Sequence, residues 1–367
     1  MATRFQEASL TVTDLIQKSH LICEGPPAQY RLITNRKNLE RDGSVRKWTF
    51  GQRDRQTKII MMVGETGTGK TTLINAMVNY MLGVKFTDEV WFEITEEEED
   101  NPISDQSKSK TTNITVYEVH ENQFSLTIID TPGYGDTRGR EYDRQIAENL
   151  NKLFHSENGV KEIDVVCLVA SKYLSNGVLS LFGKDLENNI IIMVTHSDGI
   201  TPEDALSAIK KAGIPSRKNQ PEYFLFNNRQ TVKRSPKYNT SLQTAWEQTE
   251  CSLKNFFASL KEQNRKSLKQ TKRVLTESRH LETCISNLQN HIEVVECKAK
   301  ELAQTQKALE ENKKNIKRNK NLSFTVTKYC KDYKAPIRKF SFQEGGGRNK
   351  YVTGSKDMTK CQKGPSK

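Results

Sequence analysis

The sequence has no long apolar run. Hydrophobic residues make up 35% of its 367 residues, and the longest apolar stretches are IIMMV, at 59–63, and VVCLVA, at 165–170. A membrane-spanning helix needs about 20 apolar residues, and a secretory leader needs an apolar core near the N-terminus. Neither pattern occurs, so we expect no transmembrane segment and a cytoplasmic protein.

Cysteine is also scarce and unpaired. The seven cysteines are scattered singly, without a CxxC pair or paired histidines at zinc-ligand spacing. This pattern argues against a zinc site and against a disulfide framework. It favours a reducing compartment.

The charge is unevenly distributed. The whole chain has a net charge of +12, but residues 251–367 hold 27 Lys and Arg against 11 Asp and Glu, a net +16. This basic region predicts either an anionic surface as partner, membrane or nucleic acid, or a solubilising tail. The acidic run at 96–100 would repel phosphates, and it is interpreted as a solvated loop or as a docking patch for a basic surface.

Short apolar runs alternate with helical stretches from Lys58 onward. The strand-like runs cover 58–63, 114–119, 124–130, 163–169, 189–195 and 221–226, and the helix-like ones cover 71–82, 141–154, 179–186 and 201–213. This alternation predicts an α/β fold with a mostly parallel, doubly wound sheet. Only four residues, HENQ, join the second and third runs, so these two must form an antiparallel hairpin.

The two ends of the chain are less regular. Residues 1–57 are weakly patterned, with a hairpin favoured around Asp42 and Gly43. Beyond Leu242 a stretch without Pro or Gly carries apolar residues every seventh position, which predicts a long helix. Its coiled-coil pattern is convincing from Leu281 to Leu309, so it either self-associates or binds a partner as a coil, or folds back on the domain.

The predicted organisation therefore has four parts. They are an N-terminal extension at 1–57, a nucleotide-binding domain at 58–250, a long helix or coiled coil at 251–321, and a basic, flexible tail at 322–367.

A phosphate-binding loop follows the first predicted strand. The sequence GETGTGKT matches GxxxxGK[ST] and has the strand before it and the helix after it that the motif requires. Its backbone amides and the helix N-terminus would hold phosphate oxygens. Lys70 would neutralise the β- and γ-phosphates, and the Thr71 hydroxyl would bind Mg²⁺. The predicted loop residues are Gly64, Glu65, Thr66, Gly67, Thr68, Gly69, Lys70, Thr71 and Thr72.

Two further motifs follow apolar strands. In IIDTPGYGD, Asp130 is placed to hold metal-bound water, and Gly133 can bring its N–H close to a terminal phosphate. In MVTHSDG, Asp198 can accept two hydrogen bonds from guanine, which carries adjacent N–H and NH₂ donors that adenine lacks. Thr195 would bridge back to the phosphate loop, and His196 could lay its ring against the base.

These motifs together resemble the signature set of GTPases, in the chain order of the translation-factor-related class. DTPGYGD looks like the septin form of the second motif, and THSD resembles the guanine motif of the GIMAP family. FNNR, at 226–229, looks like the final guanine-side loop of that family. The resemblance extends from 58 to about 260.

The resemblance implies GTP or GDP with Mg²⁺ as cofactors. It also implies that Asn227 or Asn228 contacts guanine. Thr111 is identified with the switch threonine that binds Mg²⁺ and the γ-phosphate, with Thr112 as the alternative. The implied metal set is Thr71, Thr111 and, through water, Asp130; the implied catalytic set is Lys70, Thr111 and Gly133.

Three departures from the family pattern affect the expected behaviour. Thr195 stands where most GTPases have Asn, which predicts a weaker link to the phosphate loop. The connection at 171–188 leaves room only for a short helix in a region that belongs to a dimer face in septin-like proteins, so the assembly mode stays open. Tyr134 follows DTPG where fast GTPases carry glutamine, which predicts slow hydrolysis.

The predicted function is therefore a homo-oligomeric GTPase switch. A second subunit or a partner would complete its site, with Arg138 and Arg140 as candidate residues acting in trans. The alternative is a non-catalytic scaffold that GTP stabilises and whose coiled coil carries the function.

Overall fold

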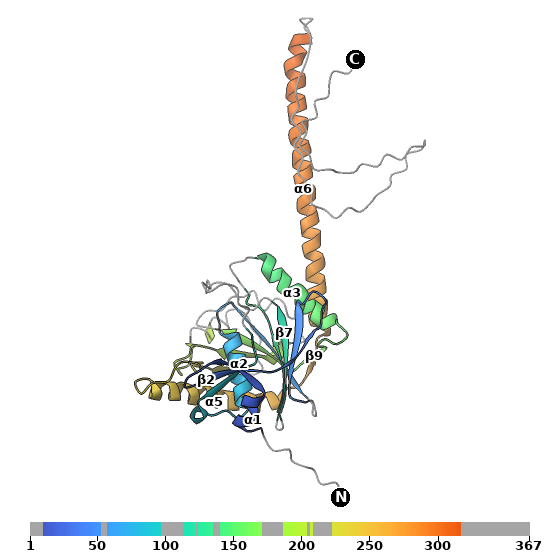
Figure 1. Cartoon of the computed structure of the whole chain (residues 1–367). Coiled ribbons are helices and arrows are strands. Elements are labelled where there is room, and N and C mark those ends of the chain that lie inside the picture. The colour runs from blue at the N-terminus through green and yellow to red at the C-terminus, as the bar shows by residue number, and fades with distance from the viewer. Residues whose placement is uncertain are drawn as a thin grey trace. The chain divides into compact units, whose positions relative to one another are not determined.

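The fold was analysed on a computed structural model of the whole chain (Figure 1). It describes residues 10–52, 57–96, 113–121, 124–134, 140–170, 186–203, 206–207 and 222–316. The chain divides into two compact units, at 1–287 and 288–367.

An eight-stranded sheet forms the centre of the first unit. In spatial order its strands are β12 (Tyr223–Leu225), β11 (Ile190–Val194), β10 (Val165–Ala170), β5 (Lys58–Gly64), β8 (Phe124–Asp130), β7 (Ile114–Glu121), β4 (Val45–Phe50) and β3 (Asn35–Asn38). The first five run parallel to one another. The predicted α/β class with a mostly parallel sheet is confirmed, as is the antiparallel hairpin between β7 and β8.

The segment before Lys58 contributes two strands to this sheet. β4 pairs in parallel with β7, and β3 pairs with β4 as an antiparallel hairpin. The predicted turn is fixed by Asp42, whose carboxylate accepts hydrogen bonds from the N–H and hydroxyl of Ser44, at 3.0 and 2.6 Å. Gly43 has a φ of 70°, which favours glycine. The main sheet therefore begins before the phosphate loop, a feature that the weak pattern of residues 1–57 did not predict.

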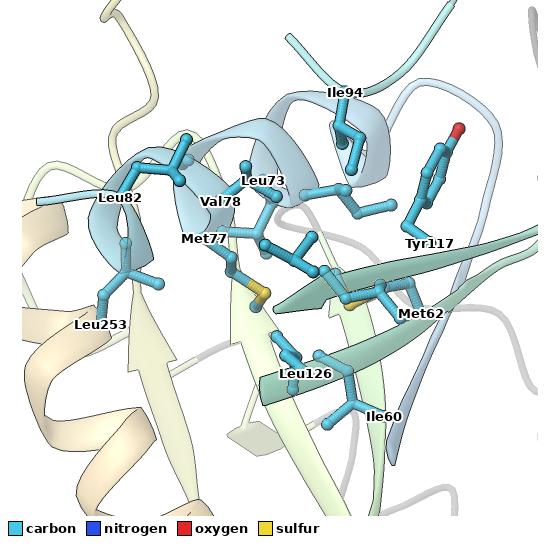
Figure 2. Close-up of a cluster of buried hydrophobic side chains, with 14 of the residues drawn as sticks. Ile60, Met62, Leu73, Met77, Val78, Leu82, Ile94, Tyr117, Leu126 and Leu253 are labelled. Atoms are coloured by element: carbon cyan, nitrogen blue, oxygen red, sulfur yellow. The ribbon is translucent and has the colours of Figure 1, made fainter. Parts of the chain in front are cut away.

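Helices cover both faces of the sheet. On one face, α2 (Lys70–Met81) packs Leu73 and Met77 against Ile60, Met62 and Leu126 of the strands (Figure 2). On the other face, the apolar side of α3 (Arg140–His155) buries Ile146, Leu150 and Leu153 in a second core cluster. The predicted helices at 71–82 and 141–154 are thus present. Most of the other two predicted helices, at 179–186 and 201–213, lies outside the described residues.

A smaller, three-stranded sheet lies beside α2. It consists of β1 (Ser19–Cys23), β2 (Ala28–Leu32) and β6 (Val90–Glu93), in that order, and β1 follows the short helix α1 (Val12–Gln17). Single 3₁₀ turns occur at Phe86–Asp88 and Glu187–Asn189.

The predicted C-terminal helix is interrupted. α5 (Asn239–Glu262) ends before a short strand, β13 (Lys266–Ser267), and α6 (Lys269–Ile316) begins only after it. β13 pairs with β9 (Glu162–Ile163), so the apolar repeat that starts at Leu253 does not run along one helix. In α5 the repeat residues are buried in the core. In α6 Val274 is half-buried, and the stripe from Leu281 onward is between 53% and 65% exposed: Leu281, Ile285, Leu288, Ile292, Val295, Leu302 and Leu309.

Candidate functional site

Three loops meet at one edge of the main sheet because they follow neighbouring parallel strands. The phosphate loop follows β5, the DTPG loop follows β8, and the THSD loop follows β11. β5 pairs directly with β8, and β10 lies between β5 and β11. Ligands of open α/β sheets bind at this carboxyl edge.

The phosphate loop is closed around its own lysine. Lys70 is the first residue of α2 and is 7% exposed. Its ammonium donates hydrogen bonds to the carbonyl oxygens of Gly64, at 3.1 Å, and Glu65, at 2.9 Å. Burial lowers the pKa of Lys70 to about 8, although the charges of Asp130 and Glu65 act in the opposite direction. The loop therefore holds a cation that bonds to carbonyls and has no salt-bridge partner among the described residues.

Two positions in this loop favour glycine, for different reasons. A Cβ at Gly64 would lie 2.2 Å from the carbonyl oxygen of Val169. Gly69 adopts a φ of 80°, which turns the chain into α2. Thr71 is half-buried at the start of the helix, Thr72 is exposed, and a Cβ at Gly67 would meet open space.

Asp130 places a buried carboxylate beside this loop. The residue is 1% exposed, and its Oδ1 has no hydrogen-bond partner within the described part of the chain. Burial raises the pKa of Asp130 to about 7, and the charge of Lys70 opposes that shift. An unpartnered, buried carboxylate oxygen can accept a hydrogen bond from metal-bound water, which is the role predicted for Asp130. This oxygen and the Thr71 hydroxyl are ligand types that fit an Mg²⁺ site.

Gly133 packs tightly against the phosphate loop. A Cβ at Gly133 would lie 2.4 Å from the hydroxyl of Thr66 and 2.6 Å from its backbone nitrogen. The next residue, Tyr134, donates its backbone N–H to the Gly64 carbonyl, at 3.1 Å, and accepts from the Thr66 N–H, at 3.3 Å. Two backbone hydrogen bonds therefore hold the DTPG loop against the phosphate loop. Only glycine at 133 allows the two backbones to lie this close together.

The side chain of Tyr134 belongs to the core. It is 4% exposed within the cluster that α3 covers, and its hydroxyl has no hydrogen-bond partner among the described residues. Burial raises the pKa of this phenol well above its ordinary value. In this conformation the phenol does not face the loop edge, so it cannot orient a water molecule there.

Thr195 makes the link that the sequence predicted to be weak. Its hydroxyl donates to the carbonyl oxygen of Thr68, at 2.7 Å, and also lies 3.2 Å from that of Ala170. The hydroxyl therefore ties the third loop to the phosphate loop and to β10. His196 adopts a φ of 54°. Its ring lies next to Gly69, since Nε2 is 3.9 Å from the position that a Cβ on Gly69 would take.

The guanine-side residues lie on two adjacent loops. Asp198 is exposed, and its Oδ1 accepts the N–H of Ile200 at 3.0 Å. The Ser197 N–H donates to the carbonyl of Phe226 at 3.0 Å, which holds the THSD loop against FNNR.

The loop of Asn227 and Asn228 rests on α5. The N–H of Asn227 donates to the hydroxyl of Thr249, at 3.3 Å, and Nδ2 of Asn228 is buried without a hydrogen-bond partner in the described chain. Sequence reasoning missed Thr249, because a threonine within a helix carries no motif that marks it as a support for a loop 22 residues earlier.

Some predicted residues cannot be placed. Thr111, Thr112 and Arg138 lie outside the described residues, as does the side chain of Arg140. The acidic run is described only at its first residue, Glu96. Among the helices of the described segments, none has both the length and the apolar content that a bilayer crossing requires.

Comparison with known proteins gives one family match. Residues 56–164 match the family described as Septin, which is less than half of the chain. The matched segment contains the phosphate loop and the DTPG loop, but not the two guanine-side loops. It supports a septin-type P-loop GTPase domain over this segment, whereas the GIMAP-like features stay a prediction. No curated protein matches the chain.

One of the similar solved structures is the bacterial selenocysteine-specific elongation factor EF-Sec. It shares 14% sequence identity and a TM-score of 0.31 over 56% of this chain. The match spans 29% of that protein's length. A likeness at this level does not bear on function.

Proposed function

We propose that this chain is a GTP-binding protein that hydrolyses GTP slowly and acts as a nucleotide-controlled switch or assembly module. The observation that carries the proposal is the pair formed by Lys70 and Asp130. Both are buried, with perturbed pKa values, at the loop edge of the sheet. Buried charges without close partners are costly, and they occur where a ligand supplies the missing charge.

Each residue then has a defined task. The amides of the loop from Glu65 to Thr71 would hold phosphate oxygens, and Lys70 would exchange its carbonyl partners for phosphates. Thr71, Thr111 and, through water, Asp130 would hold Mg²⁺, which neutralises phosphate charge when bound. Gly133 would offer its backbone N–H to the terminal phosphate.

Base selection is assigned to Asp198. Its carboxylate is exposed beside the FNNR loop, and its Oδ1 accepts the N–H of Ile200 in a local turn. Two acceptor oxygens match the adjacent N–H and NH₂ donors of guanine. Adenine lacks this donor pair, so an ATPase or kinase function of the same loop is disfavoured. Equal competition by ATP would favour that function instead.

We expect Asp198→Asn to narrow or invert the preference for GTP over xanthosine triphosphate. The amide of Asn donates where guanine also donates, whereas xanthine offers an acceptor at that position. Competition binding with the two triphosphates measures the ratio, which should fall at least about tenfold, a change of about 1.4 kcal/mol. Glu203→Gln, which neutralises another exposed carboxylate five residues farther along the chain, is the control. An unchanged ratio would place the guanine contact elsewhere.

Slow hydrolysis is inferred from Tyr134. Attack of water on the γ-phosphorus yields GDP and phosphate, and fast GTPases orient that water with a glutamine at this position. The phenol here is buried in the core and offers nothing to the water. The missing contact would come from a second subunit or a partner.

We therefore expect single-turnover GTP hydrolysis to accelerate with protein concentration. The rate constant at low concentration should match slow, unassisted GTPases, on the order of 10⁻⁴ to 10⁻³ s⁻¹. A fast rate that does not depend on concentration would contradict assembly-dependent completion of the site.

A second candidate function is the GTP-stabilised scaffold, and the exposed stripe of α6 favours it. From Leu281 the stripe alternates Leu and Ile at spacings of four and three residues, through Ile285, Leu288 and Ile292. Each Leu precedes the next Ile by four residues, which is the spacing from a d to an a position, and Ile at a with Leu at d favours parallel, two-stranded coiled coils. Light scattering in GDP and in a non-hydrolysable GTP analogue separates the two functions. A switch changes its mass with the nucleotide, and a scaffold keeps it.

A further inference from the structure

None of the described residues covers the edge strand of the small sheet, β1. Four of its five residues are exposed, including Leu21 at 52% and Ile22 at 42%. Ile33, which follows β2, is 49% exposed and lies with them along one groove. A strand edge with apolar side chains is a template for pairing with another chain.

The other edge of the small sheet is protected. Asn79 accepts the N–H of Phe92 at 2.9 Å and donates to its carbonyl at 2.6 Å, which occupies the free edge of β6. The N–H of Ile94 is likewise held by Asn75, at 3.0 Å.

The two edges of the main sheet are protected in different ways. β3 carries exposed Arg36 and Lys37, and such charges oppose strand addition. β12 is only three residues long, and α5 reaches its last residue, since Ser252 donates to the carbonyl of Leu225 at 2.6 Å. β1 lacks these protections: the sequence SHLIC contains no Lys, Arg, Asp, Glu or Pro, and the irregularity of the strand is confined to the register shift after Leu21.

We propose that β1 is a self-association strand. Two copies of this chain pair through antiparallel β1 strands centred on Leu21, which joins their small sheets across a two-fold axis. The proposal does not depend on nucleotide binding or on the coiled coil.

The charge pattern of β1 is compatible with a second copy of the same strand as the occupant. A two-fold axis places identical strands antiparallel, so each residue meets one from the same short segment. With Leu21 opposite its counterpart, His20 faces the partner's Ile22, and no two ionised residues of the strand oppose each other.

An acidic peptide fits the groove less well. The arginines that line the groove are already paired with carboxylates of this chain. Arg36 pairs with Glu96 at 2.6 Å, and Arg31 pairs with Glu96 at 3.6 Å and with Glu93 at 3.8 Å. An apolar partner is what the remaining exposed surface requires.

The contact is expected to be short. The pairing of β1 with β2 shifts register between Leu21 and Cys23, so the regular ladder covers only Ser19 to Leu21. A bulge of this kind bends the strand and limits further pairing. We therefore expect a weak dimer that forms with rising protein concentration, below the interface size of stable complexes.

The test uses the full chain with the coiled-coil stripe disabled by Leu288→Asp and Ile292→Asp. Both residues are more than half exposed, so these changes should leave the first unit folded. In sedimentation equilibrium up to about 1 mM protein, the mass should rise from 42.0 kDa toward twice that value.

Adding Leu21→Lys should raise the dissociation constant at least about tenfold, because two like charges then face each other at the axis. The matched control is Val232→Lys, at an apolar residue that is 45% exposed outside the small sheet, and it should leave the dimer unchanged. Circular dichroism and the melting temperature check that each variant folds. A mass of 42.0 kDa at every concentration, or equal dissociation constants for the two lysine variants, would overturn the proposal.

Disulfide trapping tests the register independently. Opposed residues of antiparallel strands have Cα atoms about 4.5–5.5 Å apart, which a disulfide can bridge. Leu21→Cys, combined with Cys23→Ser, should therefore yield a covalent dimer in which mass spectrometry finds the two introduced thiols joined. If the introduced thiol instead pairs with a cysteine of its own chain, the strand is covered internally and the self-association proposal is wrong.

Discussion

Lys70→Ala should abolish measurable nucleotide binding. The ammonium is the cation of the phosphate loop, and each charge-assisted bond to a phosphate contributes about 1.5–3 kcal/mol. Loss of two such bonds weakens binding by at least about a hundredfold. Isothermal titration with GTP and GDP in the presence of Mg²⁺ measures the effect, and retained micromolar affinity would contradict the assigned role.

The same substitution should not destabilise the protein without nucleotide by much. In that state the buried ammonium bonds only to the carbonyls of Gly64 and Glu65, and its lowered pKa reports a desolvation cost. Thermal unfolding with and without GTP separates the two effects, because a ligand raises the melting temperature only of the state that binds it.

Two variants refine this test. Lys70→Met keeps the aliphatic stem and removes the charge, so it should behave like Lys70→Ala. Lys85→Ala removes an exposed lysine just beyond α2, whose partner is Glu250, and it should bind GTP normally.

The sheet was predictable where strands are buried on both faces. β5 and β10 are nearly continuous apolar runs because helices cover them on both sides, and such runs stand out in a sequence. The loops after these strands follow from the same reasoning, since motifs at the carboxyl ends of parallel strands meet at one edge. The convergence of Lys70, Asp130 and Thr195 was therefore accessible from sequence.

The edges of the fold were not predictable in the same way. β3 is exposed along its whole length and consists of Asn, Arg and Lys, so its sequence resembles a loop. β4 alternates buried and half-buried residues, with Lys47 paired to Glu118 on the neighbouring strand at 2.6 Å. These strands exist because of their partners, which periodicity within a single segment does not reveal.

The break between α5 and α6 also depends on distant contacts. Residues 263–268 contain no Gly or Pro, so the helical pattern appeared to continue through them. Tertiary contacts override that local preference: the guanidinium of Arg265 bonds to Asp164 and to the carbonyl of Thr57, and β13 pairs with β9. In the site, the Thr195 hydroxyl bonds directly to the phosphate loop, and whether this link is weaker than one from Asn stays a prediction.

Asp164→Ala should cost about 3 kcal/mol of unfolding free energy, the range found when one partner of a buried ion pair is removed. The carboxylate is 2% exposed and accepts hydrogen bonds from the backbone N–H of Ile59, at 2.8 Å, from Arg265, at 3.0 Å, and from Lys58, at 3.3 Å. It fastens the start of β5 to the turn that precedes α6. Removing it leaves a buried N–H and two partly buried cations without their acceptor.

Urea unfolding followed by tryptophan fluorescence measures this cost, because all three tryptophans, Trp48, Trp91 and Trp246, lie in the core of the first unit. The matched control is Asp42→Ala. That carboxylate also bonds to a lysine, Lys152, at 2.8 Å, and it accepts the two Ser44 hydrogen bonds of the turn, but it is 55% exposed. An exposed ion pair contributes at most about 1 kcal/mol, even though the pKa of Asp42 is lowered by that bond.

The two variants therefore separate burial from pairing as the source of stability. If Asp164→Ala and Asp42→Ala cost the same, the network around Asp164 does not hold β5 in place, and the break between α5 and α6 needs another cause. If Asp164→Ala lowers the unfolding free energy more, GTP should still bind to the folded fraction. Asp164 bonds to the first residues of β5, whereas the phosphate loop follows the other end of that strand. Arg265→Met in the Asp164→Ala background should then recover part of the loss, because it removes one of the cations left unpaired.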